Sequence, residues 1–222
     1  MRFDEARRRL ARVPPSLPAM PPELVPVLLP VDGGSGPPRV PAFPVGPRRD
    51  AAVLILIHPD DEGRAVVVLA ERSAGDHRHA GQISFPGGAI EEDDESVAAA
   101  ALREAWEEVG LNAVSAGVEV VGVLAAVDVR MSGFVVHPVI AFANRAPRLA
   151  PDGREVVAIL NEPLATFLPS APIEIVTTER DGVRLRYGAY RVGHHLVWGV
   201  TAGILGRLGA YLAPAATATE PA

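Results

Sequence analysis

The sequence predicts an α/β fold in which a mixed sheet lies between helices. Short runs rich in Val, Ile and Leu alternate with turn signals, which is typical of buried strands. Apolar residues also recur at helical spacing in a few places, two of them long. The composition agrees with this fold class. With 48% hydrophobic and only 5% aromatic residues, Ala, Val and Leu must fill a core that a chain of 222 residues is long enough to bury.

The N-terminal fifty residues are expected to pack on the main domain. Residues 3–12 have the pattern of a short amphipathic helix. The segment 14–47 is so rich in Pro and Gly that we expect an arm with no regular structure beyond a local turn or an edge strand. We therefore divide the chain into a helix and Pro-rich arm at 1–50, a main domain at 51–212 and a disordered tail at 213–222.

Three hairpins are expected in the main domain. AAVLILIHP and RAVVVLAER flank the turn signal DDEG, VEVVGVLAAVDV and GFVVHPVIAFA flank RMSG, and a third pair turns at Asp181 and Gly182. Helical spacing marks Glu95–Val109, a short piece at 160–167 and the C-terminal stretch HLVWGVTAGILGRLGAYL. These helices are the expected covering layers of the sheet.

Charge and residue usage exclude several kinds of function. The net charge of -6 argues against nucleic-acid binding, because proteins that bind phosphate backbones carry a basic excess. All 21 basic residues are arginine, which excludes Schiff-base chemistry and a P-loop lysine. Because the chain has no cysteine, it has no thiolate nucleophile, and any metal must be held by oxygen or histidine.

The sequence has no segment typical of secretion or of a membrane. Its N-terminus, MRFDEARRRLARV, lacks the apolar core of a signal peptide. No apolar run approaches the roughly 18 residues that a membrane span needs. The protein is therefore expected to be cytoplasmic, with no membrane partner.

One expected helix carries an unusual concentration of acids, in the stretch FPGGAIEEDDESVAAAALREAWEEVGL. Asp93 or Asp94 is placed to cap its N-terminus, and Gly110 is placed to end it in a left-handed turn. The buried face of this helix should consist of small and aliphatic residues at a spacing of four, with two larger neighbours. These are Val97, Ala101, Ala105 and Val109, with Leu102 and Trp106 alongside.

Another face of the same helix gathers Glu104, Glu107 and Glu108 in its C-terminal half. Anions are unfavourable there, because the helix dipole is negative at that end. A Mg²⁺ or Mn²⁺ ion would reverse the energetics, since both are hard ions that take carboxylate oxygens. Arg103 is placed to fix the acids by pairing with Glu107 or with Glu95. The alternative is a solvated acidic face, which is the commoner explanation of a bare E-x-x-E-E.

The wider pattern resembles the Nudix box, G-x5-E-x7-R-E-U-x-E-E-x-G-U, in which U is aliphatic. Glu95 is followed after seven residues by REAWEEVGL, residues 103–111, which fits the second half of the box when Ala105 counts as a small U. Gly88 lies one residue further upstream than the pattern asks, which indicates an insertion in the loop. The resemblance implies an α/β/α sandwich and a pyrophosphohydrolase acting on phosphorus-containing anhydrides. It also implies Mg²⁺ or Mn²⁺ held by Glu104, Glu107, Glu108 and Gly88.

The residues before the box resemble the signature of the coenzyme A pyrophosphatase branch of that family, L-L-[TS]-x-R-[SA]-x3-R-x3-G-x3-F-P-G-G. In LAERSAGDHRHAGQISFPGG, residues 69–88, the first arginine, the serine, the spaced glycine and FPGG all fit. The second arginine is displaced, because His77 stands at its position and Arg78 follows. The resemblance implies a coenzyme A site whose substrate-binding residues are Arg72, Ser73, Arg78 and Phe85.

Arginines suit a ligand with a diphosphate and a 3′-phosphate, because a guanidinium group can grip phosphate with two hydrogen bonds. The alternative for Arg72 and Arg78 is an ordinary structural salt bridge. Downstream, PDGREVVAILNEPL is similar to a segment of the same branch, in which a carboxylate stands where Glu155 stands here. That carboxylate is a candidate further metal ligand or general base, and an exposed structural glutamate is an equal alternative.

The sequence thus predicts metal-dependent hydrolysis of coenzyme A, or of its oxidised or acyl forms, to 3′-phosphoadenosine 5′-phosphate and 4′-phosphopantetheine. The predicted catalytic residues are Glu104, Glu107, Glu108, Arg103 and Glu155. One alternative keeps the chemistry and takes ADP-ribose, a dinucleoside polyphosphate or a nucleoside triphosphate as substrate. Another is a Nudix domain that binds a nucleotide without cleaving it, which the intact box carboxylates disfavour. A homodimer contact through the Pro-rich arm is left open.

Overall fold

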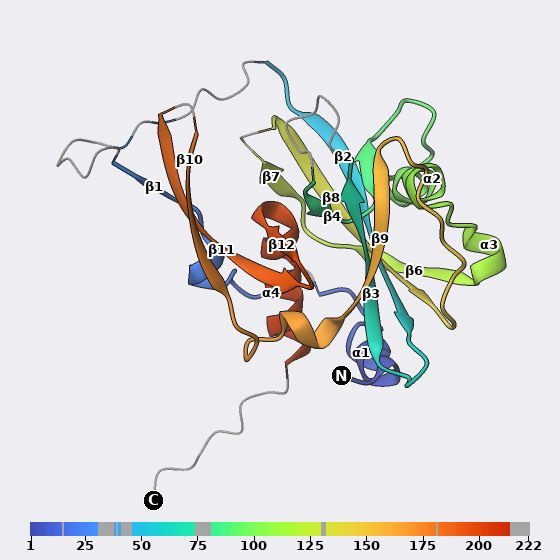
Figure 1. The fold of residues 1–222 in the computed structure, drawn as a ribbon. Helices are drawn as coiled ribbons and strands as arrows, with labels where there is room; N and C mark the ends of the chain where they lie inside the picture. The colour runs from blue at the N-terminus through green and yellow to red at the C-terminus, as the bar shows by residue number, and fades with distance from the viewer. Residues whose placement is uncertain are drawn as a thin grey trace, which may run out of the picture.

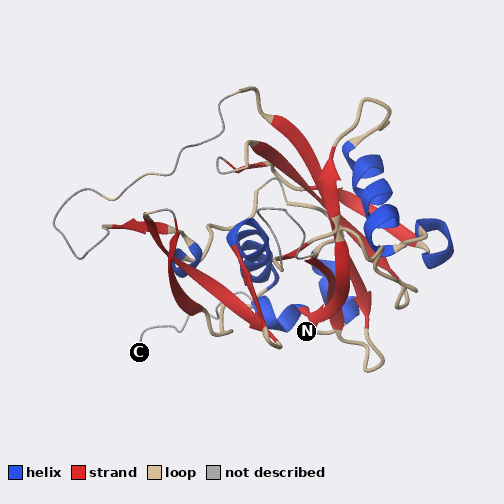
Figure 2. Cartoon of the chain, turned by 45° about the horizontal axis from the view of Figure 1, so that its top comes forward, coloured by secondary structure: helices blue, strands red, loops and turns tan. Residues whose placement is uncertain are grey.

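The computed structural model describes residues 1–14, 16–30, 38, 40, 46–73, 81–129, 132–180 and 182–213 of the chain. Two sheets and two long helices make up most of it (Figure 1). Helix α2 (Val97–Val109) covers one side of the larger sheet, and helix α4 (Gly199–Leu212) lies on its other side (Figure 1 and Figure 2). The predicted α/β fold, with a sheet between helices, is therefore confirmed.

The larger sheet contains eight strands within the described residues. They are β2 (Arg49–Pro59), β3 (Ala65–Arg72), β4 (Ile83–Ser84), β5 (Gly87–Ala89), β6 (Val118–Val123), β7 (Val127–Val129), β8 (Phe134–Ala143) and β9 (Val156–Pro163). The central path runs β4-β3-β2-β8-β6, while β5, β7 and β9 pair with β2, β8 and β3. β2 and β8 are parallel, with Leu54 beside Val139, and the other pairs are antiparallel. The sheet is mixed, as predicted.

The smaller sheet has four strands among the residues that can be described, and it lies beside α4. They are β1 (Val27–Leu29), β10 (Glu174–Arg180), β11 (Val183–Val192) and β12 (His195–Trp198). β11 is central and pairs antiparallel with each of the others. β10 and β11 are the third predicted hairpin, and Gly182 in their turn has a φ of 70°. Asp181, the other predicted turn residue, lies outside the described residues.

The other two predicted hairpins are also present. β2 and β3 pair antiparallel with Ile57 beside Val67. β6 and β7, which form the first arm of the second predicted hairpin, both pair antiparallel with β8, the second arm. Successive apolar side chains along these strands point to opposite faces, so each face of the sheet has its own hydrophobic core. One core lies under α2, and the other contains residues of α4, the smaller sheet and the N-terminal helix.

The boundaries of α2 differ from the prediction at the N-terminus. Ser96, not Asp93 or Asp94, caps the helix, and its hydroxyl accepts a hydrogen bond from the N–H of Ala99 at 3.1 Å. Gly110 ends the helix in the left-handed conformation with a φ of 66°, as predicted.

The buried face of α2 also needs one correction. Ala101, Ala105 and Val109 are buried, as predicted. Trp106 is 56% exposed. Successive residues of a helix are about 100° apart, so the side chain after Ala105 turns away from the sheet. The prediction that Trp106 belongs to the core is therefore wrong.

The C-terminal helix is shorter than predicted. Residues His195–Trp198 form β12, because they pair with β11 at the register Tyr190 beside Val197. The helix begins only at Gly199, and it packs closely: a Cβ added at Gly209 would lie 1.9 Å from the carbonyl oxygen of Phe167. Neither α4 nor any other helix of the described chain is long and apolar enough to cross a membrane.

Only the second half of the segment predicted as helix at 160–167 is helical, and the first half is strand. β9 continues to Pro163, since its residues pair with β3 as far as Val66. Only Leu164–Phe167 forms a helical turn, the 3-10 helix η3. Tertiary strand pairing has overridden the local helical spacing here.

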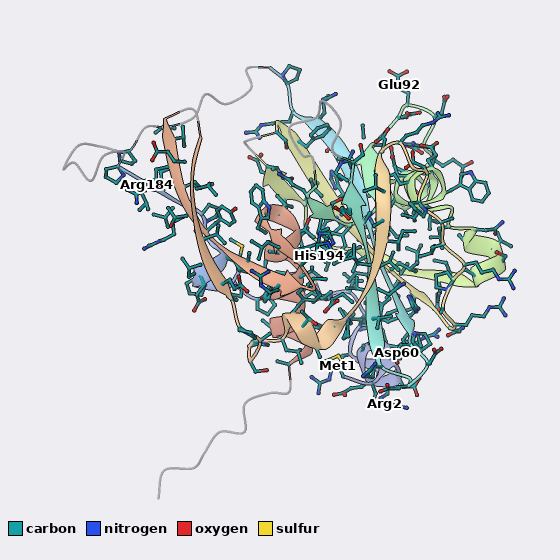
Figure 3. The ribbon with its side chains drawn as sticks, in the orientation of Figure 1. Met1, Arg2, Asp60, Glu92, Arg184 and His194 are labelled. Atoms are coloured by element: carbon teal, nitrogen blue, oxygen red, sulfur yellow. The ribbon has the colours of Figure 1, made fainter. Side chains whose placement is uncertain are left out.

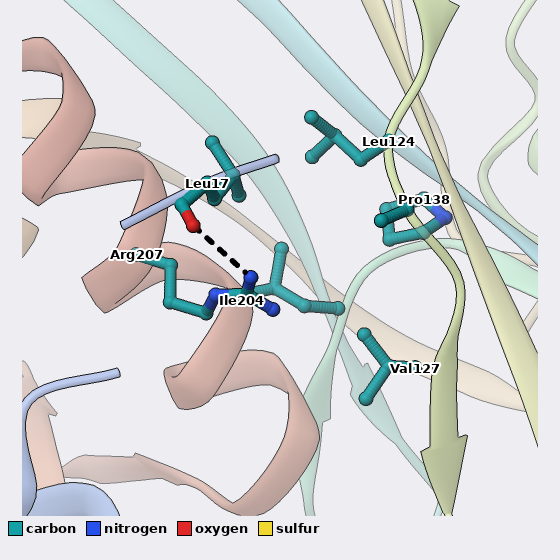
Figure 4. A pocket seen from close by; sticks show the side chains of 7 residues that line it. Leu17, Leu124, Val127, Pro138, Ile204 and Arg207 are labelled. Atoms are coloured by element: carbon teal, nitrogen blue, oxygen red, sulfur yellow. Dashed lines mark hydrogen bonds between the residues drawn. The ribbon is translucent and has the colours of Figure 1, made fainter. Parts of the chain in front are cut away.

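The N-terminal segment contributes to the core that also contains α4. Helix α1 (Phe3–Arg9) is shorter than the predicted 3–12, and a 3-10 turn η1 (Pro22–Leu24) precedes β1. Arg207 of α4 donates to the carbonyl oxygens of Leu17 and Pro18, at 3.3 and 2.9 Å. Figure 4 shows Leu17 beside Ile204 and Leu124 in the pocket that these segments line. Residues 214–222 of the predicted tail lie outside the described chain.

Candidate active site

The three acids of the α2 cluster lie in different environments. The side chain of Glu108 is 4% exposed, that of Glu104 is 15% exposed, and that of Glu107 is 54% exposed. Glu104 and Glu108 are one turn apart and both meet strand β5, where Gly87 and Gly88 stand. The site therefore runs from a buried carboxylate to one that is open to solvent.

Glu108 is a buried carboxylate with two donors. Its Oε2 accepts a hydrogen bond from the N–H of Gly87 at 2.9 Å, and its Oε1 is 3.2 Å from the guanidinium of Arg72. Burial nevertheless raises the pKa of Glu108 to about 7, with the two donors opposing that shift. A positive ion at this carboxylate would favour its charged form.

Glu104 lies directly against the backbone of β5. A Cβ added at Gly88 would be 2.5 Å from the Glu104 carboxyl carbon, so only glycine lets the chain approach this closely. Burial raises the pKa of Glu104, and the neighbouring Arg103 opposes the shift. Gly88 thus shapes the site through its missing side chain, as expected for a residue that permits close backbone approach.

Arg103 organises the loop that leads into α2. Its Nε and Nη2 contact the carboxylate of Asp94 at 3.1 and 3.0 Å, and Nη2 also donates to the carbonyl oxygen of Ala89 at 3.0 Å. Its Nη1 contacts Glu104 at 3.0 Å and Glu107 at 3.2 Å. The hydrogen bond with Arg103 lowers the pKa of Asp94. Arg103 therefore fixes two box carboxylates relative to the loop, which confirms the predicted pair with Glu107.

Arg72 joins the box to a distant part of the chain. Its two Nη atoms lie 3.2 Å from Glu108 and 3.2 Å from Glu155. The N–H of Ser73 donates to the backbone oxygen of Glu155 at 2.8 Å, which ties the end of β3 to the start of β9. The structure thus brings Arg72, Ser73 and Glu155 to the α2 acids, and the Glu155 side chain is 62% exposed.

One predicted substrate-binding residue, Phe85, does not join this group. Phe85 is 3% exposed and belongs to the core on the side of the sheet away from α2. Its neighbour two positions earlier, Ile83, is buried in the same core, because alternate strand residues point to one face. The predicted contact of Phe85 with substrate is therefore corrected to a core role. Arg78 and His77 lie outside the described residues.

Arginines hold the carboxylates of the cluster in this structure. In the part of the chain that is described, no three Asp, Glu, His or Cys side chains are grouped so that they could hold a metal ion. The guanidinium groups of Arg72 and Arg103 instead lie on Glu104, Glu107 and Glu108. Each of these contacts uses one carboxylate oxygen: Oε1 of Glu104, Oε2 of Glu107 and Oε1 of Glu108.

A family comparison agrees with this geometry. The model of the NUDIX domain matches residues 47–165, which include β2 to β9 and the α2 acids. The chain belongs to the Nudix family. It is a Nudix hydrolase, a pyrophosphohydrolase that acts on phosphorus-containing anhydrides. The α2 loop and helix are accordingly its Nudix box.

Relatives of similar length share the name Nudix hydrolase NudL. The protein from Citrobacter koseri is 40% identical over 161 residues, which cover 72% of this chain and 81% of that protein. The protein from Pectobacterium atrosepticum is 37% identical over 167 residues, 74% of this chain and 83% of that protein.

Solved structures of Nudix proteins are also similar. The Nudix hydrolase RenU from M. smegmatis has a TM-score of 0.45 and 27% identity, covering 55% of this chain and 74% of that one. A MutT/nudix family protein from Enterococcus faecalis has a TM-score of 0.47 and 18% identity, covering 77% of this chain and 63% of that one.

The donor set of this Nudix hydrolase fits a divalent cation, which Nudix hydrolases generally use. The candidate donors are carboxylates, the ligand type that hard divalent ions prefer. Glu108 is buried and pays a desolvation cost when charged, which a cation would offset. The missing side chain of Gly88 leaves the backbone against Glu104. The chemistry of the residues therefore agrees with the family.

Three contributors to the Nudix site were missed by the sequence reasoning. Asp94 was expected to cap α2, but its carboxylate forms an ion pair with Arg103. Glu95 was expected as a partner of Arg103, and the ion pairs of the described residues include none between the two. The N–H of Gly87 supports Glu108. Asp152 accepts from the N–H groups of Glu155 and Val156 and so orders the turn before β9. Asp94 could have been considered as a partner of Arg103 from the sequence, because it is an acid nine residues earlier. No sequence pattern predicts that the N–H of Gly87 donates to Glu108.

Proposed function

We propose that this Nudix hydrolase cleaves the diphosphate bond of coenzyme A, or of its oxidised or acyl forms. The products are 3′-phosphoadenosine 5′-phosphate and 4′-phosphopantetheine. The observation that carries the proposal is the signature at residues 69–88, whose first arginine, Arg72, contacts the buried box acid Glu108. This contact supports a site that includes both the first arginine of the signature and the box.

Mg²⁺ or Mn²⁺ is the proposed cofactor, with Glu104, Glu107, Glu108 and the backbone of Gly88 as its holders. When bound, such an ion neutralises the diphosphate and stabilises charge on the leaving phosphoryl oxygen. Arg103 keeps Glu104 and Glu107 in place through its contacts with the loop. This arrangement orients the acids before substrate arrives, which lowers the reorganisation needed for reaction.

Arg72 is the proposed phosphate ligand. Its two Nη atoms contact Glu108 and Glu155, so its guanidinium group lies among the carboxylates of the site. A phosphate group can accept two such hydrogen bonds at once. Ser73, which follows it at the end of β3, is the second proposed substrate contact, and Arg78 is the proposed partner for a further phosphate.

Glu155 is the proposed general base. Its carboxylate is exposed, so water reaches it, and its contact with Arg72 keeps it beside the phosphate ligand. A carboxylate in this position can take a proton from the attacking water. A cytoplasmic location and a homodimer remain predictions from the sequence.

Product analysis separates this proposal from its alternatives. The purified protein is incubated with Mg²⁺ or Mn²⁺ and with coenzyme A, ADP-ribose or a dinucleoside polyphosphate in parallel, and the products are resolved by chromatography. We expect coenzyme A to yield 3′-phosphoadenosine 5′-phosphate and to be cleaved fastest. Rapid cleavage of ADP-ribose with inert coenzyme A would contradict the proposed substrate and keep the pyrophosphohydrolase chemistry.

A further inference from the structure

Two adjacent histidines have their rings in contact at the turn between β11 and β12. The ring centroids of His194 and His195 are 3.8 Å apart, and the rings are tilted by 39°. Gly193 in the same turn has a φ of 57°, a conformation that glycine adopts without strain. The turn therefore presents two imidazole rings as one unit.

Strand β3 anchors this ring pair. The Nε2 of His195 lies 3.7 Å from the carboxylate of Glu71, and their side chains are only 13% and 25% exposed. β12 also contacts β4, the neighbour of β3. In Figure 3, His194 lies between β12 and strand β3 of the larger sheet. The smaller sheet thus places its histidines against the end of the strand that carries Arg72.

The outer ring of the pair is not explained by packing. The contact with Glu71 accounts for His195, whereas the side chain of His194 is exposed. Both residues lie beyond residues 47–165, so they are not part of the NUDIX domain match. An imidazole that is held against a second ring and open on its outer face is a preorganised surface for a planar ligand.

We propose that His194 is a stacking platform for the purine base of the substrate. Histidine is among the side chains on which nucleic-acid bases stack. The inference rests on the proposed function for the position of the diphosphate, which lies at Arg72. On one side of the sheet Glu71 contacts His195, and on the other side Arg72 contacts Glu108. A nucleotide would cross the end of β3 to place its phosphates at Arg72 and its base at His194.

The test compares two ligands that differ only in the base. Adenosine 5′-monophosphate and ribose 5-phosphate share the sugar and the phosphate, and neither contains an anhydride that the enzyme could cleave. Their binding to the full-length protein with Mg²⁺ is measured by isothermal titration calorimetry. The variants are His194→Ala, His194→Phe, which keeps a flat ring, and the control Ile175→Ala, an exposed apolar residue of the same sheet.

We expect His194→Ala to weaken binding of adenosine 5′-monophosphate about tenfold, within the range found for loss of one base-stacking aromatic. Binding of ribose 5-phosphate should not change. His194→Phe should restore most of the lost affinity, and Ile175→Ala should bind like the unaltered protein. Three results would each contradict base stacking on His194. They are unchanged binding of adenosine 5′-monophosphate by His194→Ala, an equal loss of affinity for both ligands, and no recovery of affinity in His194→Phe.

The outcome is independent of which diphosphate is the substrate. If coenzyme A is inert but His194→Ala discriminates between the two ligands as expected, the proposed substrate fails and the platform stands. If coenzyme A is cleaved and His194→Ala raises neither its KM nor the dissociation constant of adenosine 5′-monophosphate, the platform fails and the proposed function stands.

Discussion

Replacing Glu108 by glutamine is expected to lower kcat by at least about 100-fold, the upper end of the loss found when only a residue supporting a metal ligand is removed. Glutamine keeps the size of the side chain and an oxygen that can accept from the N–H of Gly87. It cannot become charged, so it loses the interaction with a cation. The rate of coenzyme A cleavage, measured at saturating Mg²⁺, checks this expectation.

Glu92→Gln is the matched control for this variant. Glu92 is an exposed acid of the loop before α2, and it points away from the body of the protein in Figure 3. We expect Glu92→Gln to retain full turnover and both variants to have the circular dichroism spectrum of the unaltered protein. Full turnover by a normally folded Glu108→Gln protein would show that the buried box acid has no part in the reaction.

The metal-free protein is expected to become less stable as the pH rises from about 4.5 to about 7. Glu108 has its pKa raised by burial from 4.5 to about 7. Between these values the folded protein keeps a proton that the unfolded chain has released, so the free energy of unfolding falls as pH rises. The full loss, reached above about pH 7, is about 3 kcal/mol at ~1.4 kcal/mol per pKa unit.

Urea unfolding in a chelator at several pH values measures this dependence. The informative quantity is the difference between the unaltered protein and Glu108→Gln, because contributions from groups that do not interact with Glu108, such as Asp60, are common to both. We expect the free energy of unfolding of the unaltered protein, minus that of Glu108→Gln, to decrease by about 3 kcal/mol from pH 5 to pH 8. A difference that does not change with pH would mean that Glu108 titrates alike in the folded and unfolded states.

Local sequence patterns were sufficient for much of the fold. The strands of the first hairpin, β2 and β3, have continuous apolar runs bounded by turn residues, and they pair as expected. Gly110 ends α2 because only a residue at ease with positive φ suits that position. The relative positions of Glu104 and Glu108 follow from the helical repeat alone. Features set by neighbours in sequence were therefore predictable.

Features set by distant contacts were not predictable. His195–Trp198 has helical spacing but forms a strand because β11 offers it a pairing edge. Asp94 does not cap α2 because Arg103, nine residues later, takes its carboxylate. The contact of Arg72 with Glu155 joins positions that are 83 apart in the sequence. Family resemblance implied roles for Arg72 and Glu155, and finding their contacts required the fold.

The residues of the signature before the box differ in where the structure places them. Arg72 of the signature lies beside the box, where it contacts Glu108. Phe85 has the same standing in the signature, yet its ring is in the core. A sequence pattern does not distinguish a residue that contacts a ligand from one that fixes the strand beside it.

Binding of Mn²⁺ tests the central claim, that the acidic face of α2 holds a divalent cation. The electron paramagnetic resonance signal of free Mn²⁺ is followed as the unaltered protein, Glu108→Gln or Glu92→Gln is added, without substrate. We expect the unaltered protein and Glu92→Gln to bind Mn²⁺ alike, and Glu108→Gln to bind it at least about tenfold more weakly. Equal Mn²⁺ binding by Glu108→Gln and the unaltered protein would contradict the assignment of the site.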